Sequence, residues 1–179
     1  MGIIELIREG KLQELTSQVF GQKLSANAKG CFTAVLSAEE EMAAVQMMLS
    51  SDEQNVSHWL DFLLDYSRTY LLSNQSIDVL IDNINNTAAK DLLAFIFNRF
   101  GYNDEQAIKV CKLALNGGGS YNVQQVLLVI CDSGRVLSED VAMILSRIDA
   151  MLTNKGKAEF AVLEKSYRQS VETYRKSDV

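Results

Sequence analysis

The sequence of 179 residues contains no proline. At the usual frequency of roughly 5%, a chain of this length would contain about nine. Because proline is common in turns, extended linkers and proline-rich recognition segments, its absence argues against a turn-rich β-sandwich or barrel. Turns must be made by glycine, asparagine, aspartate and serine instead. The composition therefore favours a chain that is helical along nearly its whole length.

Cysteine and histidine are also scarce. The three cysteines, Cys31, Cys111 and Cys131, are far apart and lie within apolar periodic stretches, which predicts buried, reduced thiols rather than disulfides or a metal site. The single histidine, His58, excludes a histidine-rich metal site, and the Glu-x-x-His motif of di-iron bundles is missing. We expect His58 to be at the surface or half-buried, and we expect no metal and no cofactor.

Long apolar runs are missing as well. The longest, residues 92–97 and 126–131, contain six residues each, whereas a membrane-spanning helix needs roughly 20. We therefore expect no membrane span. Glu5 falls where a signal peptide would be apolar, so we expect a cytoplasmic protein.

Recognisable catalytic motifs are equally absent from the sequence. The glycines at 117–119 have neither the following lysine nor the preceding strand of a phosphate-binding loop. A cysteine nucleophile activated by His58 is geometrically conceivable, but the cysteines lie on predicted core faces. We expect no enzyme, although a pair of carboxylates within residues 37–86 that act as acid and base stays open.

What the sequence does contain is apolar spacing of helical period nearly everywhere. Capping boxes are predicted at Ser37–Glu40 and Ser51–Gln54, where a serine oxygen and a side chain three residues later satisfy each other's backbone amides. Further helices are expected to begin after Ser73, Asn103 and Ser138. One helix is expected to end at Gly101. The predicted apolar faces include Val56, Trp59, Leu60, Leu63, Leu64, Tyr70 and Leu71; Ile77, Leu80, Ile81 and Ile84; Ile108, Cys111 and Leu115; and Val123, Val126, Leu127 and Ile130.

These helices predict an all-α, single-domain protein (1–179) of about 8–10 helices, arranged as antiparallel helical hairpins in a short repeat-like array or as an irregular bundle. Residues 1–86 form an acidic N-terminal half, residues 87–156 two hairpins, and residues 157–179 a C-terminal amphipathic helix. An offset of 35 residues superimposes the two hairpins, with Asn103 on Ser138. Any two amphipathic hairpins of similar length could align this well, so a true repeat and a chance alignment both stay open.

The net charge of −6 is unevenly distributed. Residues 37–86 contain nine acids and one base, Arg68. Some of these carboxylates lie in first helical turns, where the helix dipole favours them. The members of two like-charged pairs four residues apart do not all share that cause, and such pairs cost helix stability. These pairs, Asp61 with Asp65 and Asp78 with Asp82, are predicted to bind a partner with a basic or amphipathic segment, or to form a solvated acidic face.

Two further groups of side chains are candidates for interaction surfaces. Flexible methionine side chains suit adaptable binding surfaces, and the three that lie within the acidic segment cannot all face one way; they are Met42, Met47 and Met48. Near the C-terminus, apolar residues at alternating spacings of three and four form a coiled-coil-like seam that packs on the domain or on a second copy; they are Phe160, Leu163, Tyr167, Val171 and Tyr174.

The leading functional hypothesis is a non-enzymatic protein-protein interaction module, such as an adaptor, a chaperone-like or a regulatory protein. One alternative is an acidic inhibitor or immunity-type protein that occupies a basic nucleic-acid-binding cleft. A further alternative is a small helical ligand-binding protein or enzyme with a pocket between hairpins. Direct nucleic-acid binding is not expected, because the pI is near 4.8 and the C-terminal bases alternate with glutamates.

Overall fold

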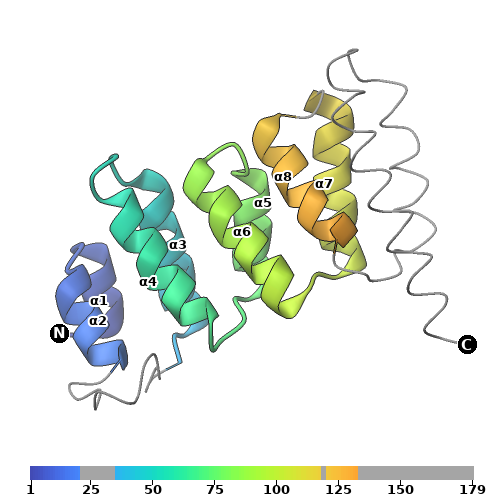
Figure 1. The fold of residues 1–179 in the computed structure, drawn as a ribbon. Helices are drawn as coiled ribbons and strands as arrows, with labels where there is room; N and C mark the ends of the chain where they lie inside the picture. The colour runs from blue at the N-terminus through green and yellow to red at the C-terminus, as the bar shows by residue number, and fades with distance from the viewer. Residues whose placement is uncertain (21–34, 118–119, 133–179) are drawn as a thin grey trace, which may run out of the picture. The chain divides into compact units, whose positions relative to one another are not determined.

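The computed structural model describes residues 1–20, 35–117 and 120–132 (Figure 1). Within these residues the chain forms eight helices and no strand, which confirms the predicted all-α fold. None of the described helices is long and apolar enough to cross a membrane. The helices are α1 (Ile3–Arg8), α2 (Leu12–Phe20), α3 (Ala38–Ser50), α4 (Val56–Ser67), α5 (Asn74–Asp82), α6 (Thr87–Phe100), α7 (Asp104–Gly117) and α8 (Tyr121–Asp132).

Contacts between residues divide the chain into two compact units, unit 1 (Met1–Asn83) and unit 2 (Ile84–Val179). The boundary lies in the turn between α5 and α6. That both units belong to one domain stays a prediction.

Unit 1 contains two layers of helices. In one layer α1 packs on α3 and α3 on α5, and in the other α2 packs on α4 (Figure 1). The chain reverses between α1 and α2 at Gly10, whose φ of 69° is a conformation that favours glycine. The largest fully buried side chains of unit 1 are Leu6, Ile7, Leu15, Met48, Leu63, Tyr66, Leu72, Ile77, Leu80 and Ile81.

Two of the predicted helix starts in unit 1 are confirmed. The Ser37 Oγ accepts a hydrogen bond from the Glu40 N–H, and the Glu40 carboxylate accepts one from the Ser37 N–H. The Ser73 Oγ caps α5 by accepting from the Ser76 N–H. Both helices therefore begin where the sequence places their caps.

The predicted capping box at Ser51–Gln54 is wrong. Ser51 ends α3 instead, and its Oγ donates to the Met47 carbonyl at 2.6 Å. The next turn begins at Asp52, whose Oδ1 accepts from the Asn55 N–H at 2.9 Å. Asp52 thus organises a separate turn, and α4 begins four residues later than its predicted start, at Val56, without a side-chain cap.

The predicted face of α4 is also partly wrong. The buried side chains are Trp59, Phe62, Leu63 and Tyr66, whereas Leu60 and Leu64 are half-buried. Since α4 ends at Ser67, Leu71 lies in the following loop and is 52% exposed. The helix contacts both α2 and α3, so its buried stripe follows two neighbours rather than the most apolar arc.

Two long-range hydrogen bonds connect the helices of unit 1. The Tyr66 Oη at the end of α4 accepts from the Leu36 N–H at 3.1 Å, just before α3. The buried Glu41 carboxylate on α3 accepts from the Ser73 N–H at 2.7 Å, at the start of α5. Buried polar groups cost free energy unless they are paired, so these two side chains fix the ends of α4 and α5 against α3.

In unit 2, α6 and α7 both pack on α8. Gly101 ends α6 with a φ of 84°, and Asn103 exchanges hydrogen bonds with Gln106 at the start of α7, both as predicted. The predicted face of α8 is confirmed, whereas α7 buries Ala107, Val110 and Cys111 and leaves Ile108 half-buried. Leu115 is not among the residues whose side chains are described.

Helices α6 and α8 share one pattern. Their caps, Asn86 and Ser120, are 34 residues apart. The same interval relates their buried positions, which are Ala89 and Val123, Leu92 and Val126, Leu93 and Leu127, and Ile96 and Ile130. The interval is one residue shorter than the predicted offset of 35. Because residues 133–156 lie outside the described part of the chain, the repetition of whole hairpins stays a prediction.

Candidate functional site

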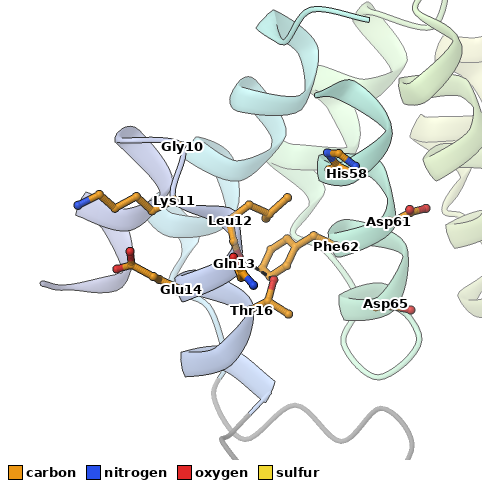
Figure 2. A pocket seen from close by; sticks show the side chains of 10 residues that line it. All are labelled: Gly10, Lys11, Leu12, Gln13, Glu14, Thr16, His58, Asp61, Phe62 and Asp65. Carbon is orange, nitrogen blue, oxygen red and sulfur yellow. Dashed lines mark hydrogen bonds between the residues drawn. The ribbon is translucent and has the colours of Figure 1, made fainter. Parts of the chain in front are cut away.

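Unit 1 contains an open groove of about 670 Å³ between α2 and α4 (Figure 2), which we call the α2–α4 groove. The turn at Gly10 forms part of its lining. From there α2 supplies one side and α4 the other. The lining residues are Gly10, Lys11, Leu12, Gln13, Glu14, Thr16, His58, Asp61, Phe62 and Asp65.

The α4 side of the groove follows from helical spacing. One face of α4 carries His58 together with the residues three, four and seven positions later, which are Asp61, Phe62 and Asp65. Phe62 extends from α4 toward α2 and is 4% exposed, whereas Asp61 and Asp65, which also line the groove, extend from the side of α4 away from α2 and so mark its outer rim (Figure 2). The groove thus combines an aromatic floor with a carboxylate rim.

The α2 side is mostly uncharged where it faces α4. Leu12 and Thr16 are half-buried, one helical turn apart, and the Thr16 hydroxyl donates to the Leu12 carbonyl. The Lys11 side chain extends away from α4 (Figure 2) and forms an ion pair with Glu9 at 2.9 Å. The hydrogen bond to Glu9 raises the pKa of Lys11, so the Lys11 cation is paired within the turn between α1 and α2.

The carboxylates on the rim are weakly neutralised. Asp65 lies 3.7 Å from Arg68, and both side chains are about half exposed or more, which leaves that pair screened by water. Asp61 is exposed, and the structure shows no ion pair for it with another described residue. The rim therefore presents negative charge beside an apolar floor.

A second groove of about 570 Å³, which we call the α1–α3 groove, lies on the other layer of unit 1. Arg8 and Glu39 form an exposed ion pair across it at 2.9 Å. Met42 and Met47 line this groove and are half-buried. Its other lining residues are Ile7, Ala38, Ala43, Gln46, Ser50 and Gln75.

The predicted partner-binding residues do not form a single site. Asp61 and Asp65 line the α2–α4 groove, whereas Met42 and Met47 line the α1–α3 groove. Met48 is fully buried in the core. Two residues, Asp78 and Asp82, are exposed on α5 and line neither groove. The predicted seam, Phe160, Leu163, Tyr167, Val171 and Tyr174, lies outside the described residues.

Sequence reasoning missed the apolar side chains of the α2–α4 groove. Phe62 was left out of the predicted face of α4, although it follows Trp59 by three residues and precedes Tyr66 by four. That aromatic spacing was the available signal. Leu12 is apolar in the sequence, but nothing in the sequence shows that α2 would lie beside α4.

The described residues include few groups suited to metal binding or nucleophilic chemistry. No group of three or more histidine, cysteine or acidic side chains in the described part of the chain could hold a metal ion. Cys111 is a free, buried cysteine of unit 2, and burial raises the pKa of its thiol to about 12. Because the thiolate is the reactive form, Cys111 is not a nucleophile at neutral pH. His58 is exposed, as expected.

Comparisons with known proteins assign no function. No protein family, no curated protein and no solved structure matches the chain significantly. The grooves of unit 1 are therefore the features from which a function can be argued.

Proposed function

We propose that this chain is a non-enzymatic protein-interaction module that receives a segment of a partner protein in the α2–α4 groove of unit 1. The observation that carries the proposal is the position of Asp61 and Asp65 beside the floor formed by Phe62 and Leu12. Apolar contact supplies binding free energy, and charge supplies attraction and selectivity. An open, mixed surface of this kind suits a polypeptide segment.

The exposure of the carboxylates supports binding rather than chemistry. Acid-base catalysis is most effective in a site that excludes water and holds the reacting atoms. Asp61 is exposed, and Asp65 is half-buried beside Arg68. Hydrated carboxylates in an open groove attract cations over several ångströms but do not enclose a substrate.

The groove also favours this function over that of an acidic inhibitor. A chain that mimics phosphates inserts its carboxylates into a basic cleft of the partner. Here Asp61 and Asp65 line the outer rim of a groove with an apolar floor, which accommodates a side chain from the partner. In this proposal the partner therefore inserts a side chain into this protein, rather than the reverse.

Charge reversal tests the proposal. Asp61→Lys and Asp65→Lys change the rim, whereas Asp78→Lys and Asp82→Lys change the net charge of unit 1 equally, at the same spacing, outside both grooves. Each variant is used for affinity purification from the native host with quantitative mass spectrometry. We expect the rim variant to lose about 90% of a specific partner, a tenfold loss, and the α5 variant to keep it.

The comparison between the two variants decides the outcome. Equal losses in both would show that general acidity, rather than the groove, attracts the partner. Equal recovery in both would overturn the proposal. Circular dichroism and thermal unfolding of each variant show whether the fold is preserved, so that a loss of binding is not confused with unfolding.

A further inference from the structure

We infer that the partner segment in the α2–α4 groove is a basic amphipathic helix with two Lys or Arg side chains one turn apart beside an apolar residue. This inference rests on the proposed function and specifies the chemistry of the occupant. The charge of the groove, its backbone hydrogen bonding and the residue spacing on α4 each point to this occupant.

The charge of the groove selects a cationic occupant. Unit 1 contains twelve acidic and five basic residues in its sequence. In the groove lining, the α4 rim carries two carboxylates, Asp61 and Asp65, and the one lysine, Lys11, is paired with Glu9 and extends away from α4. A segment that brings cations to this rim gains attraction, whereas an acidic segment is repelled.

Backbone hydrogen bonding selects a helix over an extended strand. Both sides of the groove are α-helices, whose backbone N–H and C=O groups are satisfied within each helix. An extended segment finds no sheet edge there to complete its own hydrogen bonds, as it would in β-augmentation. A helical segment satisfies its own backbone and presents only side chains to the groove.

The spacing on α4 sets the spacing on the occupant. Asp61 and Asp65 are four residues apart, about 6 Å along the helix axis, and Phe62 lies between them along the helix and extends toward α2. A helix that runs alongside α4 matches this with cations at positions i and i+4 and with an apolar residue on its inner face. Long basic side chains can lie across the aromatic floor while their charges reach the rim.

The chain contains a built-in reporter of groove occupancy. Trp59 is the single tryptophan of the sequence, and its ring lies edge-on to that of Phe62, with 6.0 Å between ring centroids. Because Phe62 lines the groove and Trp59 is buried behind it, a ligand that presses on Phe62 alters the surroundings of the indole. Tryptophan fluorescence therefore reports binding without a label.

The experiment uses the full chain and synthetic peptides that contain no tryptophan. The probe is an alanine-rich helix of about 18 residues with a leucine face and lysines at i and i+4. Three controls have the same length: lysines spread around the helix, glutamates in place of lysines, and an extended Lys-x-Lys peptide rich in β-branched residues. Titrations follow Trp59 fluorescence for the natural chain, the Asp61→Lys/Asp65→Lys variant and the Asp78→Lys/Asp82→Lys variant.

We expect saturable binding of the probe that falls about tenfold in the rim variant and less than about twofold in the α5 variant. Added salt should weaken it. Equal affinity for the peptide with spread lysines, tighter binding of the extended peptide, or no response to the probe would each overturn the inference. If the probe fails while the rim variant still loses its partner, the proposed function stands and the helical occupant does not.

Discussion

At the scale of single residues, neighbouring polar side chains at the end of α4 have opposite roles. The Tyr66 hydroxyl accepts a hydrogen bond from the buried Leu36 N–H at 3.1 Å. The next side chain, Ser67, is fully buried, and its Oγ has no hydrogen-bond partner in the described part of the chain. A buried hydroxyl contributes stability only when it is paired, so replacing these two residues should have different effects.

Tyr66→Phe should therefore be more harmful than Ser67→Ala. Removing the Tyr66 hydroxyl leaves the Leu36 N–H without its partner, which should cost about 1–2 kcal/mol of unfolding free energy. Ser67→Ala removes an unpaired hydroxyl and should change stability by less than about 0.5 kcal/mol. Urea unfolding of both variants provides the measurement. A larger loss in Ser67→Ala would contradict the hydrogen-bonding scheme.

The same variant carries a pH signature. Burial is the main cause that raises the pKa of Tyr66 above its ordinary value of 10.0, so the folded state holds the phenol proton more tightly than the unfolded state does. Its contribution to stability is complete below pH 10.0 and is lost as the pH rises through the raised pKa. Tyr66→Phe should lose less stability above pH 10.0 than the natural chain. Buried Cys111 adds an alkaline loss to both proteins, and the comparison removes it.

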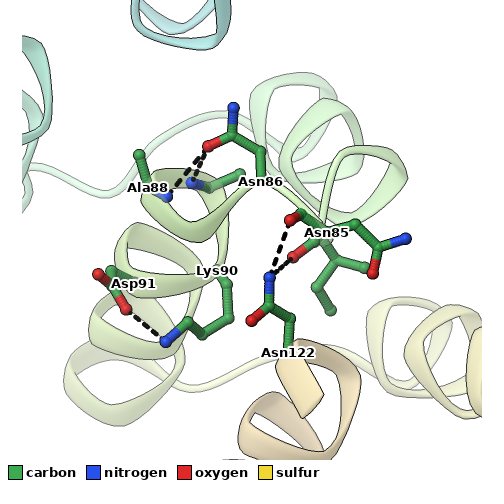
Figure 3. A network of polar contacts seen from close by, with 8 residues as sticks. Asn85, Asn86, Ala88, Lys90, Asp91 and Asn122 are labelled. Atoms are coloured by element: carbon green, nitrogen blue, oxygen red, sulfur yellow. Dashed lines mark hydrogen bonds and ion pairs between the residues drawn. The ribbon is translucent and has the colours of Figure 1, made fainter. Parts of the chain in front are cut away.

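At the scale of elements, the start of α8 is fastened to the turn before α6 (Figure 3). The Asn122 side-chain amide donates to the carbonyls of Ile84 and Asn85, both at 3.0 Å. Asn86 in the same turn caps α6. One asparagine on α8 thus holds the turn from which α6 begins, so the two helix starts are coupled through side-chain amides rather than apolar contact alone.

Asn122→Ala should loosen this junction. The loss of both hydrogen bonds should cost about 1–2 kcal/mol of unfolding free energy. The backbone amides of α8 should then exchange hydrogen faster than in the natural chain, whereas those of α4 should be little changed. Hydrogen-exchange mass spectrometry measures this difference locally. Asn98→Ala, at an exposed position on α6, is the matched control and should change little. Unchanged exchange in α8 after Asn122→Ala would show that apolar packing alone holds the helix.

The sequence predicts elements better than it predicts their surroundings. Caps such as Ser37, Ser73 and Asn103 were found because each acts within three residues of the chain. The face of α4 was misplaced because α2 and α3 both pack on this helix, which local spacing does not reveal. The acidic residues of the candidate site, Asp61 and Asp65, could likewise be found in the sequence. The contribution of Leu12 to the groove could not, because it depends on how α2 packs beside α4.

At the scale of the whole molecule, negative charge is concentrated in one unit. The sequence of unit 1 contains twelve acids and five bases, whereas that of unit 2 contains eleven acids and twelve bases. The total charge of −6 is thus the sum of a strongly acidic unit 1 and a nearly neutral unit 2. Long-range attraction of cationic partners is accordingly a property of unit 1.

The absence of proline makes a prediction about the folding of the entire chain. X-Pro isomerisation produces slow refolding phases of about 10–100 s, and this sequence has no X-Pro bond. In double-jump experiments, the refolding amplitudes should not depend on how long the chain has been kept unfolded. Stopped-flow fluorescence of Trp59 provides the signal. A slow phase that grows with the time spent unfolded would contradict the prediction.

The scarcity of bases around α4 also limits where trypsin can act. Between Lys29 and Lys90 the only tryptic site follows Arg68, an exposed residue in the turn after α4. The N–H of the scissile Arg68–Thr69 bond donates to the Tyr66 carbonyl at 3.2 Å, so the turn must open before a protease can hold it in an extended form. The rate of cleavage at this one bond therefore reports local opening at the end of α4. An occupant of the nearby groove should lower that rate.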